Sequence, residues 1–535
     1  MSTRAAFLPM LMLSQWKKKQ NPRRPLPLKG QKRLANISPI RILKKAGLIV
    51  CFFLSTTISF AVPDQVWQFS EEMLKAYRLV LNLQPDKAQE ILSKISSPAE
   101  ELHKIYVLSL SETVDILITE DQKRFDQLET NFRQRLQHID NLPESAEKLF
   151  LEAELNLQKG FNLLNMGQNL NAVLAIRRAY NTSQECIKKY PTFAPIKKTY
   201  GVIQVMIGSV PDKYHWFMSL LGMRGSVVKG QKLLQELRES RSSLSTEATI
   251  LFFCIKGFIN QQFAESALGF SEILKEQPEN RLVLFIAINM CMKDAQSEKA
   301  LEYMATLDHH NQGLQMYYIE YLHAEALLNK GEYQNAIAYY QKFLRGYHSQ
   351  SFKKDAHYKI AICNWLLNNE AEAKIYFERA KTVGRDQADP DKNAAMQLLE
   401  NKFPNKKLLR VRYFTDGGFY KEAQHVVQSI QFTELHSLKE QTEYFYRLAR
   451  LAHKTEEFSV AKIYYEETIK LSKENPWYFA PNAALQLGYI YRDQNDFEKA
   501  KKYFELAMSY RRHEYKSSID TKSRSALDQM KASKG

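Results

Sequence analysis

Apolar residues recur at spacings of three and four along almost the whole chain from Ser70 onward. This spacing places them on one face of an α-helix, and Ser70 followed by Glu71 and Glu72 has the residue types that open a helix. No stretch alternates apolar and polar residues for long enough to form a β-strand. The pattern therefore predicts an all-α fold built from many helices.

A set of small and aromatic residues repeats in the C-terminal half. In its last copy, counted from Pro481, the set occupies positions 8, 11, 17, 20, 24 and 27, which are Gly488, Tyr491, Phe497, Ala500, Phe504 and Ala507. The same pattern occurs 39 residues earlier around Ala449, and two further copies around Ala324 and Ala361 are 37 residues apart. Small residues opposite large ones let two antiparallel helices interlock, so the period predicts helix pairs stacked into an α-solenoid.

Repeat spacing and composition divide the chain into five segments. We expect a basic leader at 1–61, an N-terminal helical arm with degenerate repeats at 62–200, a glycine-rich helical junction at 201–244, a C-terminal repeat array at 245–510 and a basic polar tail at 511–535. A capping helix before a frayed end is one interpretation of this tail. Glycines crowd into thirty residues of the junction, which favours broken or closely packed helices there. The same segment contains five strongly apolar side chains that we expect to be buried: Trp216, Phe217, Met218, Leu220 and Leu221.

The positive charge of the chain belongs mostly to its leader. The formal net charge is +16, and residues 1–45 contain twelve Lys or Arg and no Asp or Glu, which leaves 16 − 12 = +4 for the rest. A surface that follows the phosphates of a nucleic acid needs more positive charge than this. We therefore expect no nucleic-acid partner.

The leader has the organisation of an export signal. An apolar run, Ala46–Phe60, follows Arg41, Lys44 and Lys45, and Ser59 and Ala61 are small residues suited to cleavage after Ala61. We expect a cleaved signal peptide and a periplasmic protein. The alternative is an uncleaved inner-membrane anchor, which would also leave the repeats outside the cytoplasm and would be the only contact with a membrane.

The cysteines give no sign of a metal site or a redox motif. Cleavage would leave Cys186, Cys254, Cys291 and Cys363, each in an apolar helical stretch and none at C-x-x-C spacing. Buried free thiols are the simplest interpretation, and one long-range disulfide stays open as an alternative.

Catalytic motifs are also missing from the sequence. It contains no G-x-S-x-G, H-E-x-x-H, G-x-x-x-x-G-K-[ST] or G-x-G-x-x-G motif. His309 and His310 adjoin Asp308, but adjacent residues point in different directions and no third metal ligand has suitable spacing. We expect no catalytic residues, no cofactor and no metal.

Two segments resemble tetratricopeptide repeats. They are SFKKDAHYKIAICNWLLNNEAEAKIYFERA and YFAPNAALQLGYIYRDQNDFEKAKKYFELAMSY. Their order, with a glycine-rich segment before the C-terminal repeats, resembles the tetratricopeptide repeat protein 39 family, which includes the yeast inclusion-body-clearance proteins. The leader departs from those intracellular relatives and favours a bacterial, exported branch. The resemblance implies an adaptor without catalysis.

The repeat register also predicts a binding groove. In a helix-pair solenoid the first helix of each pair lines the concave face, and its positions 2, 5, 9, 12 and 13 point into that face. The candidate groove residues are Tyr318, Tyr321, Tyr358, Trp365, Tyr446, Arg450, Tyr489 and Arg492. Tyr, Trp and Arg carry much of the binding energy at protein interfaces, so this lining suits a protein or peptide partner. The alternative for each residue is packing against the next repeat.

The sequence therefore favours a non-enzymatic, exported repeat scaffold that binds a protein or peptide in a concave groove, in cell-envelope assembly or secretion. A second hypothesis is a lipid- or glycan-binding pocket in the glycine-rich junction, bordered by Tyr214, His215 and Trp216.

Overall fold

The computed structural model describes residues 67–210, 215–386, 388–472 and 475–532. The described residues form helices joined by turns and contain no β-strand, which confirms the all-α prediction. No helix among them is both long and apolar enough to cross a membrane.

Six helices form the N-terminal arm. They are α1 (Glu71–Leu81), α2 (Pro85–Lys94), α3 (Glu101–Thr119), α4 (Gln122–Asp140), α5 (Ala146–Asn165) and α6 (Asn169–Lys189), with a 3-10 turn at Pro98–Glu100. Ser70 caps α1 as the sequence predicts, because its side-chain oxygen accepts a hydrogen bond of 3.2 Å from the backbone N–H of Met73. α5 and α6 pack along their length, and Gly160 of α5 gives Ile176 of α6 room to approach.

The glycine-rich junction consists of closely packed helices, as predicted. It contains α7 (Ile196–Gly208), α8 (His215–Leu220) and α9 (Val227–Arg238). A Cβ atom on Gly230 of α9 would lie 2.4 Å from the carbonyl oxygen of Gly201 of α7, so the two backbones touch. The predicted burial is confirmed for Met218 of the short α8, and it is wrong for Trp216 and Leu220, which are 67% and 73% exposed.

The C-terminal array continues the helical pattern. Its first part contains α10 (Ser245–Cys254), a π-helical turn (Ile255–Ile259), α11 (Phe263–Glu276), α12 (Arg281–Lys293), α13 (Ser297–His309), α14 (Tyr317–Lys330), α15 (Tyr333–Gly346), α16 (Lys353–Leu366) and α17 (Glu370–Thr382). Its second part contains α18 (Asp389–Leu399), α19 (Lys406–Gly417), α20 (Tyr420–Gln428), a 3-10 turn (Phe432–Glu434), α21 (Leu438–Lys454), α22 (Phe458–Ser472), α23 (Phe479–Asp493), α24 (Phe497–Ser509) and α25 (Lys516–Ala532).

The last helix pair shows why the repeat needs its small and large residues. A Cβ atom on Gly488 of α23 would lie 2.6 Å from the ring of Phe504 of α24, so only glycine lets this ring sit against the helix backbone. Ala500 and Ala507 of α24 are fully buried. α25 covers α23 and α24 with Ile519 and other apolar side chains, so the segment expected to be a polar tail contains a capping helix.

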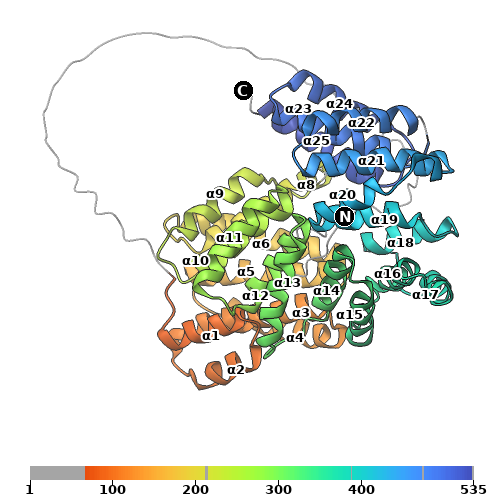
Figure 1. The fold of residues 1–535 in the computed structure, drawn as a ribbon. Helices are drawn as coiled ribbons and strands as arrows, with labels where there is room; N and C mark the ends of the chain where they lie inside the picture. Colours follow the sequence, from red (N-terminus) through yellow and green to blue (C-terminus); the bar gives the residue numbers. More distant parts are fainter. Residues whose placement is uncertain (1–66, 211–214, 387, 473–474, 533–535) are drawn as a thin grey trace, which may run out of the picture.

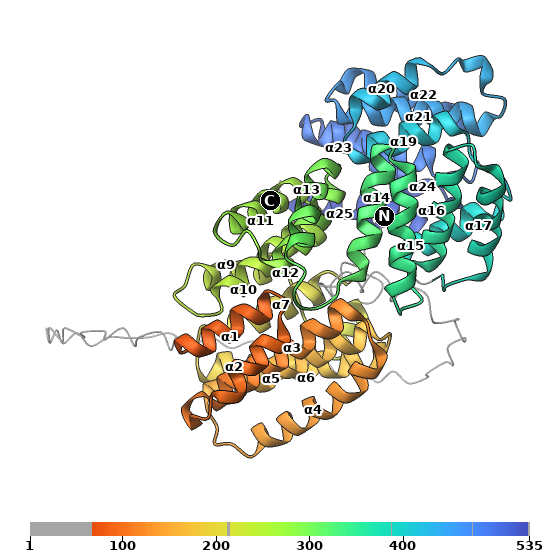
Figure 2. The same cartoon turned by 60° about the horizontal axis from the view of Figure 1, so that its bottom comes forward.

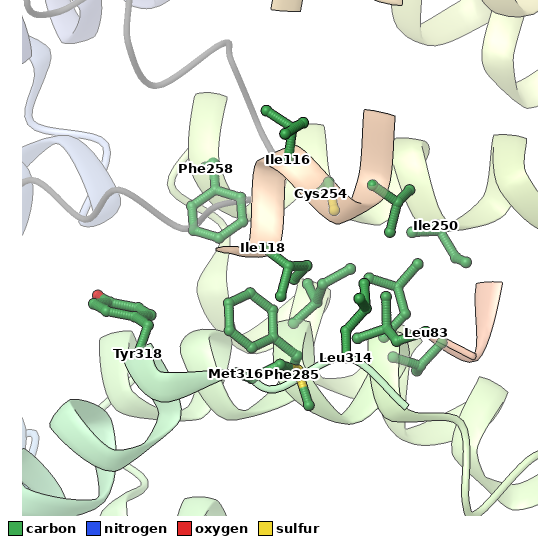
Figure 3. Close-up of a cluster of buried hydrophobic side chains, with 14 of the residues drawn as sticks. Leu83, Ile116, Ile118, Ile250, Cys254, Phe258, Phe285, Leu314, Met316 and Tyr318 are labelled. Atoms are coloured by element: carbon green, nitrogen blue, oxygen red, sulfur yellow. The ribbon is translucent and has the colours of Figure 1, made fainter. Parts of the chain in front are cut away.

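The N-terminal arm packs back onto the array. Figures 1 and 2 show α1–α6 at one end of the molecule and α21–α24 at the opposite end. The backbone N–H of Leu314 donates to the carbonyl oxygen of Leu83 (2.8 Å), and that of Arg281 donates to the Asn82 side chain (2.8 Å). Side chains from α3, α10, α12 and the segment before α14 meet in one apolar cluster at this contact (Figure 3). A single core therefore extends from Trp67 to Tyr413, across the expected boundary at residue 245.

The array also coils tightly enough for nonadjacent repeats to touch. Gly418 has a φ of +90°, and a Cβ atom there would lie 2.0 Å from the carbonyl oxygen of Ala295, so the turn after α19 rests on the turn after α12. α19 also packs on α14. α18 lies between two helix pairs and is fixed by Asp391, whose carboxylate accepts the backbone N–H groups of Phe352 (2.6 Å) and Asp355 (3.0 Å) at the start of α16.

Candidate partner-binding groove along helix α21

Helix α21 presents a row of polar and aromatic side chains toward the neighbouring repeats. Ser437 and Glu440 form a capping box at its N-terminus, which fixes where the helix begins. Lys439, Glu443, Tyr446, Arg447, Arg450 and Lys454 follow at spacings of three and four and occupy one side of the helix. We call this side the inner face of α21. From Lys439 to Lys454 it is about 22 Å long, at roughly 1.5 Å per residue.

A surface pocket of about 690 Å³ lies at the N-terminal end of the inner face. It is lined by Met396, Glu400, Lys402, Ser437, Leu438, Lys439, Pro476, Trp477 and Glu514. Leu438 is 44% exposed although it is apolar. Lys439 forms an ion pair with Glu400, and burial raises the pKa of Glu514 on the opposite wall. The pocket therefore combines apolar side chains with charged side chains of both signs.

An arginine–tyrosine cluster occupies the middle of the inner face. Arg447 donates to the Glu443 carboxylate (2.6 Å) and to the Tyr478 hydroxyl (3.0 Å). The Tyr478 ring meets the edges of Tyr446 (ring centroids 5.5 Å apart) and Tyr515 (5.1 Å). These mutual contacts bury Tyr446 and Arg447, which expose 3% and 6% of their surface, and Tyr478 stays partly exposed.

The C-terminal end of the inner face is basic. The Asp416 carboxylate of α19 lies 3.6 Å from an Arg450 nitrogen and 3.7 Å from an Arg412 nitrogen. Lys454 follows Arg450 by one helical turn. Burial and the charge of Arg450 lower the pKa of Lys454, so this end already holds more positive charge than its surroundings favour.

Four of the eight predicted groove residues are buried between repeats. Tyr318, Tyr321, Tyr358 and Tyr446 each expose at most 6% of their surface. Tyr318 stacks on Tyr321 (5.6 Å), and the Tyr321 hydroxyl donates to Asp355 (2.6 Å). Because α14 also packs on α19, these side chains have no open space in front of them. These four side chains therefore pack against neighbouring repeats and do not line an open groove.

The other four predicted residues are half-buried and differ in their surroundings. The Trp365 ring is stacked on Phe403 (4.9 Å), covered by the Lys406 ammonium (3.9 Å) and bonded through its N–H to the Pro404 carbonyl (2.9 Å). Tyr489 and Arg492 lie together near Asp493, on α23. Of the eight residues, Arg450 lies on the inner face of α21 with part of its surface exposed.

The pocket residues were not predicted from the sequence. Leu438 and Trp477 belong to the start of α21 and to the turn before α23, which the repeat register assigns to neither helix of a pair. Met396 and Glu400 come from the end of α18, a helix that the register does not include. An exposed Leu after the Ser437 capping box and a Pro-Trp pair in an inter-repeat turn are the signals that could have indicated them.

The junction does not form the enclosed pocket of the second hypothesis around Trp216, because this ring is 67% exposed. The side chains of Tyr214 and His215 lie outside the described residues. Cys186, Cys254, Cys291 and Cys363 are buried free thiols, and burial raises the pKa of each. Within the described ranges no three His, Cys, Asp or Glu side chains gather as a metal site.

Family models identify the type of repeat. Two family models, both described as tetratricopeptide repeat, match residues 321–392 and residues 442–475 and 481–514. Among solved structures, the human IFIT1 dimer with PPP-AAAA is 13% identical, with 83% of this chain and 95% of that chain covered and a TM-score of 0.29. The tetratricopeptide repeat domain of P58(IPK) is 15% identical (71% and 99% covered, TM-score 0.20), and yeast Tom70 is 15% identical (86% and 88%, TM-score 0.23). The family models, together with the interlocked helix pairs, establish that this chain contains tetratricopeptide repeats.

Proposed function

We propose that this protein is a non-enzymatic scaffold that binds a segment of a protein partner along the inner face of α21. The observation that carries the proposal is the pocket around Leu438 and Trp477, which opens directly onto this face. An apolar pocket beside the partly exposed rings of Trp477 and Tyr478 is the kind of surface that anchors a peptide. Repeat proteins of this type expose such extended surfaces between their ends.

The proposal includes the compartment predicted from the leader. We propose that the scaffold acts outside the cytoplasm, in cell-envelope assembly or secretion, after cleavage behind Ala61 or with the leader kept as an anchor. The order of segments that resembles the tetratricopeptide repeat protein 39 family supports an adaptor role. N-terminal sequencing of the protein isolated from its native cells tests the leader: a first residue of Val62 is expected, and a cytoplasmic protein that begins at Met1 would contradict export.

Site-specific photocrosslinking tests the groove. A benzophenone amino acid replaces Leu438 in the pocket or Ile375 on α17, which is 51% exposed and lies outside the pocket. Irradiation in native cells followed by mass spectrometry should give a defined crosslinked partner from position 438 and none from position 375. Equal crosslinking at both positions, or none at 438, would remove the groove from the proposal.

A further inference from the structure

Five basic side chains from four helices lie within electrostatic reach of one another near the C-terminal end of the inner face. They are Lys293 of α12, Arg412 of α19, Arg450 and Lys454 of α21, and Lys522 of α25, and we call them the basic cluster. Asp416 joins Arg412 and Arg450. The lysines lie within electrostatic reach of this pair or of each other, since the charge of Lys522 acts on Lys293 and that of Arg450 acts on both Lys454 and Lys522. All five are half-buried.

The carboxylates near the basic cluster are too few to balance it. Asp416 is shared by two arginines, Asp389 is engaged by Lys392 (2.8 Å), and Asp294 accepts the Gln296 amide (2.6 Å). No carboxylate of the described residues lies within ion-pair distance of the ammonium groups of Lys293, Lys454 or Lys522, and these groups donate no hydrogen bond to the described residues.

This arrangement costs free energy unless an anion joins it. Burial and the charge of Lys522 lower the pKa of Lys293 to about 7, and burial and Arg450 lower the pKa of Lys522 and of Lys454. Asp389 opposes the shift at Lys293, and Asp294 and Asp416 oppose it at Lys454, without reversing either. His453 beside them has a pKa of about 4 and stays neutral above that pH. A bound anion would raise the pKa of each of the three lysines and so favour its charged form.

The pocket at the N-terminal end of the inner face favours an acidic peptide over a nucleic acid as the ligand. The pocket there is lined by two acidic side chains, Glu400 and Glu514, and two basic ones, Lys402 and Lys439, so it adds no net positive charge that could continue a track of phosphate contacts. Apolar side chains instead find Leu438, Met396 and Trp477 at that end. An extended peptide of about seven residues spans the distance of about 22 Å between the pocket and the basic cluster.

We propose that the groove binds an acidic peptide segment whose carboxylates contact Lys293, Arg450, Lys454 and Lys522 while its apolar residues enter the pocket beside Leu438. The proposal rests on the function proposed above and adds the chemical class of the partner. Its contacts are charge-assisted hydrogen bonds in a half-buried setting, which are stronger than those on an open surface. Binding should therefore take up protons at neutral and higher pH, and affinity should be highest near pH 6 and fall as the pH rises through the lysine pKa values.

Fluorescence anisotropy with the full chain tests this proposal. The probe is a labelled 12-residue peptide with Leu and Trp at one end and four Glu at the other, compared with the same peptide carrying four Gln. The variant is Lys454→Gln/Lys522→Gln. The matched control, Lys275→Gln/Lys470→Gln, removes two lysines whose side chains are 68% and 76% exposed. A labelled 12-nucleotide single-stranded DNA provides the nucleic-acid arm.

We expect saturable binding of the Glu peptide that weakens about tenfold or more in the Gln peptide and in the cluster variant, but not in the control variant. The pH dependence between 6 and 9 should be smaller in the cluster variant than in the wild type. Circular dichroism checks that each variant is folded. If the double variant unfolds, the single variant Lys522→Gln replaces it in the binding measurements.

Three results would overturn the proposal: no binding of the Glu peptide, equal binding of the Glu and Gln peptides, or displacement of the Glu peptide by DNA at lower concentration. If Leu438 still crosslinks to a partner in native cells while any of these results holds, the scaffold function stands and only the acidic nature of the partner is lost. Loss of that crosslink as well would end both proposals.

Discussion

At the scale of single residues, the most unusual feature is a lysine inside the core. The Lys198 ammonium lies 2.7 Å from Glu154, 2.8 Å from Glu247 and 2.6 Å from the Tyr106 hydroxyl. Burial opposes its charge, but the two carboxylates together raise the pKa of Lys198. The network joins α3, α5, α7 and α10, so one side chain connects the N-terminal arm to the junction and the array.

Replacing Lys198 with Met should therefore be costly. Two carboxylates would lose their partner in the core, and breaking a buried ion pair in this way costs about 3–5 kcal/mol of unfolding free energy. Urea denaturation followed by circular dichroism measures the change. Lys275→Met at an exposed position should stay within about 0.5 kcal/mol of the wild type. A loss below about 1 kcal/mol in Lys198→Met would show that the carboxylates find other partners.

Asp391 should make stability depend on pH. Burial raises the pKa of this carboxyl from 3.8 to about 7, although its two backbone N–H bonds oppose the shift. The folded protein then holds a proton that the unfolded chain lacks, so the stabilisation is complete below about pH 4 and is lost as the pH rises through about 7. Asp391→Asn keeps a carbonyl acceptor and cannot ionise, so the stability of this variant should fall less than that of the wild type between pH 4 and 8.

Urea midpoints at several pH values measure this effect. Asp126→Asn, at an exposed carboxylate of α4 that is not among the groups acting on Asp391, should keep the slope of the wild type. Parallel pH profiles for Asp391→Asn and wild type would contradict the raised pKa.

At the scale of helices, the contact of α7 with α9 depends on glycine. Because a Cβ atom on Gly230 would lie 2.4 Å from the Gly201 carbonyl oxygen and 3.0 Å from the Val205 nitrogen, the clash is with backbone and cannot be relieved by a rotamer change. Gly230→Ala should cost about 1–3 kcal/mol through overpacking, despite the better helix propensity of Ala. Lys232→Ala, exposed on the same helix, provides the control in thermal denaturation. A stability of Gly230→Ala equal to the wild type would mean that α7 and α9 can separate without loss.

The helices also show what sequence can and cannot predict. Ser70 and the glycine and alanine positions of the last repeats were predicted because each acts through contacts within one helix or one pair. Helix α18 was not predicted, because it lacks the repeat residues and is held by the contact of Asp391 with the start of α16, which is distant in the sequence. The buried tyrosines of α14 and α16 were placed in a groove for the same reason: the return of α19 onto α14 leaves no trace in the period of the sequence.

At the scale of the whole molecule, apolar burial is unevenly distributed. One core runs from Trp67 to Tyr413, whereas the helices from α19 to α25 bury their side chains in three separate smaller clusters. In a repeat array the stability of each unit depends on its neighbours, and units with little shared core can unfold first. The proposed groove lies where the large core ends and the small clusters begin.

The C-terminal helices should therefore unfold before the rest of the chain. Ile519→Asp places a charge in the buried contact of α25 with α23 and α24. It should lower the local free energy of unfolding of α21–α25 by several kcal/mol and leave that of the larger core unchanged. Hydrogen exchange with mass spectrometry resolves the two regions, and Ser525→Asp, exposed on the same helix, is the control. Equal loss of protection in α5 and α23 would mean that the molecule unfolds as one unit. If exchange increases only in α21–α25, the half of the groove that carries Lys454 and Lys522 can open without disturbing the N-terminal arm, which gives an extended partner a way in.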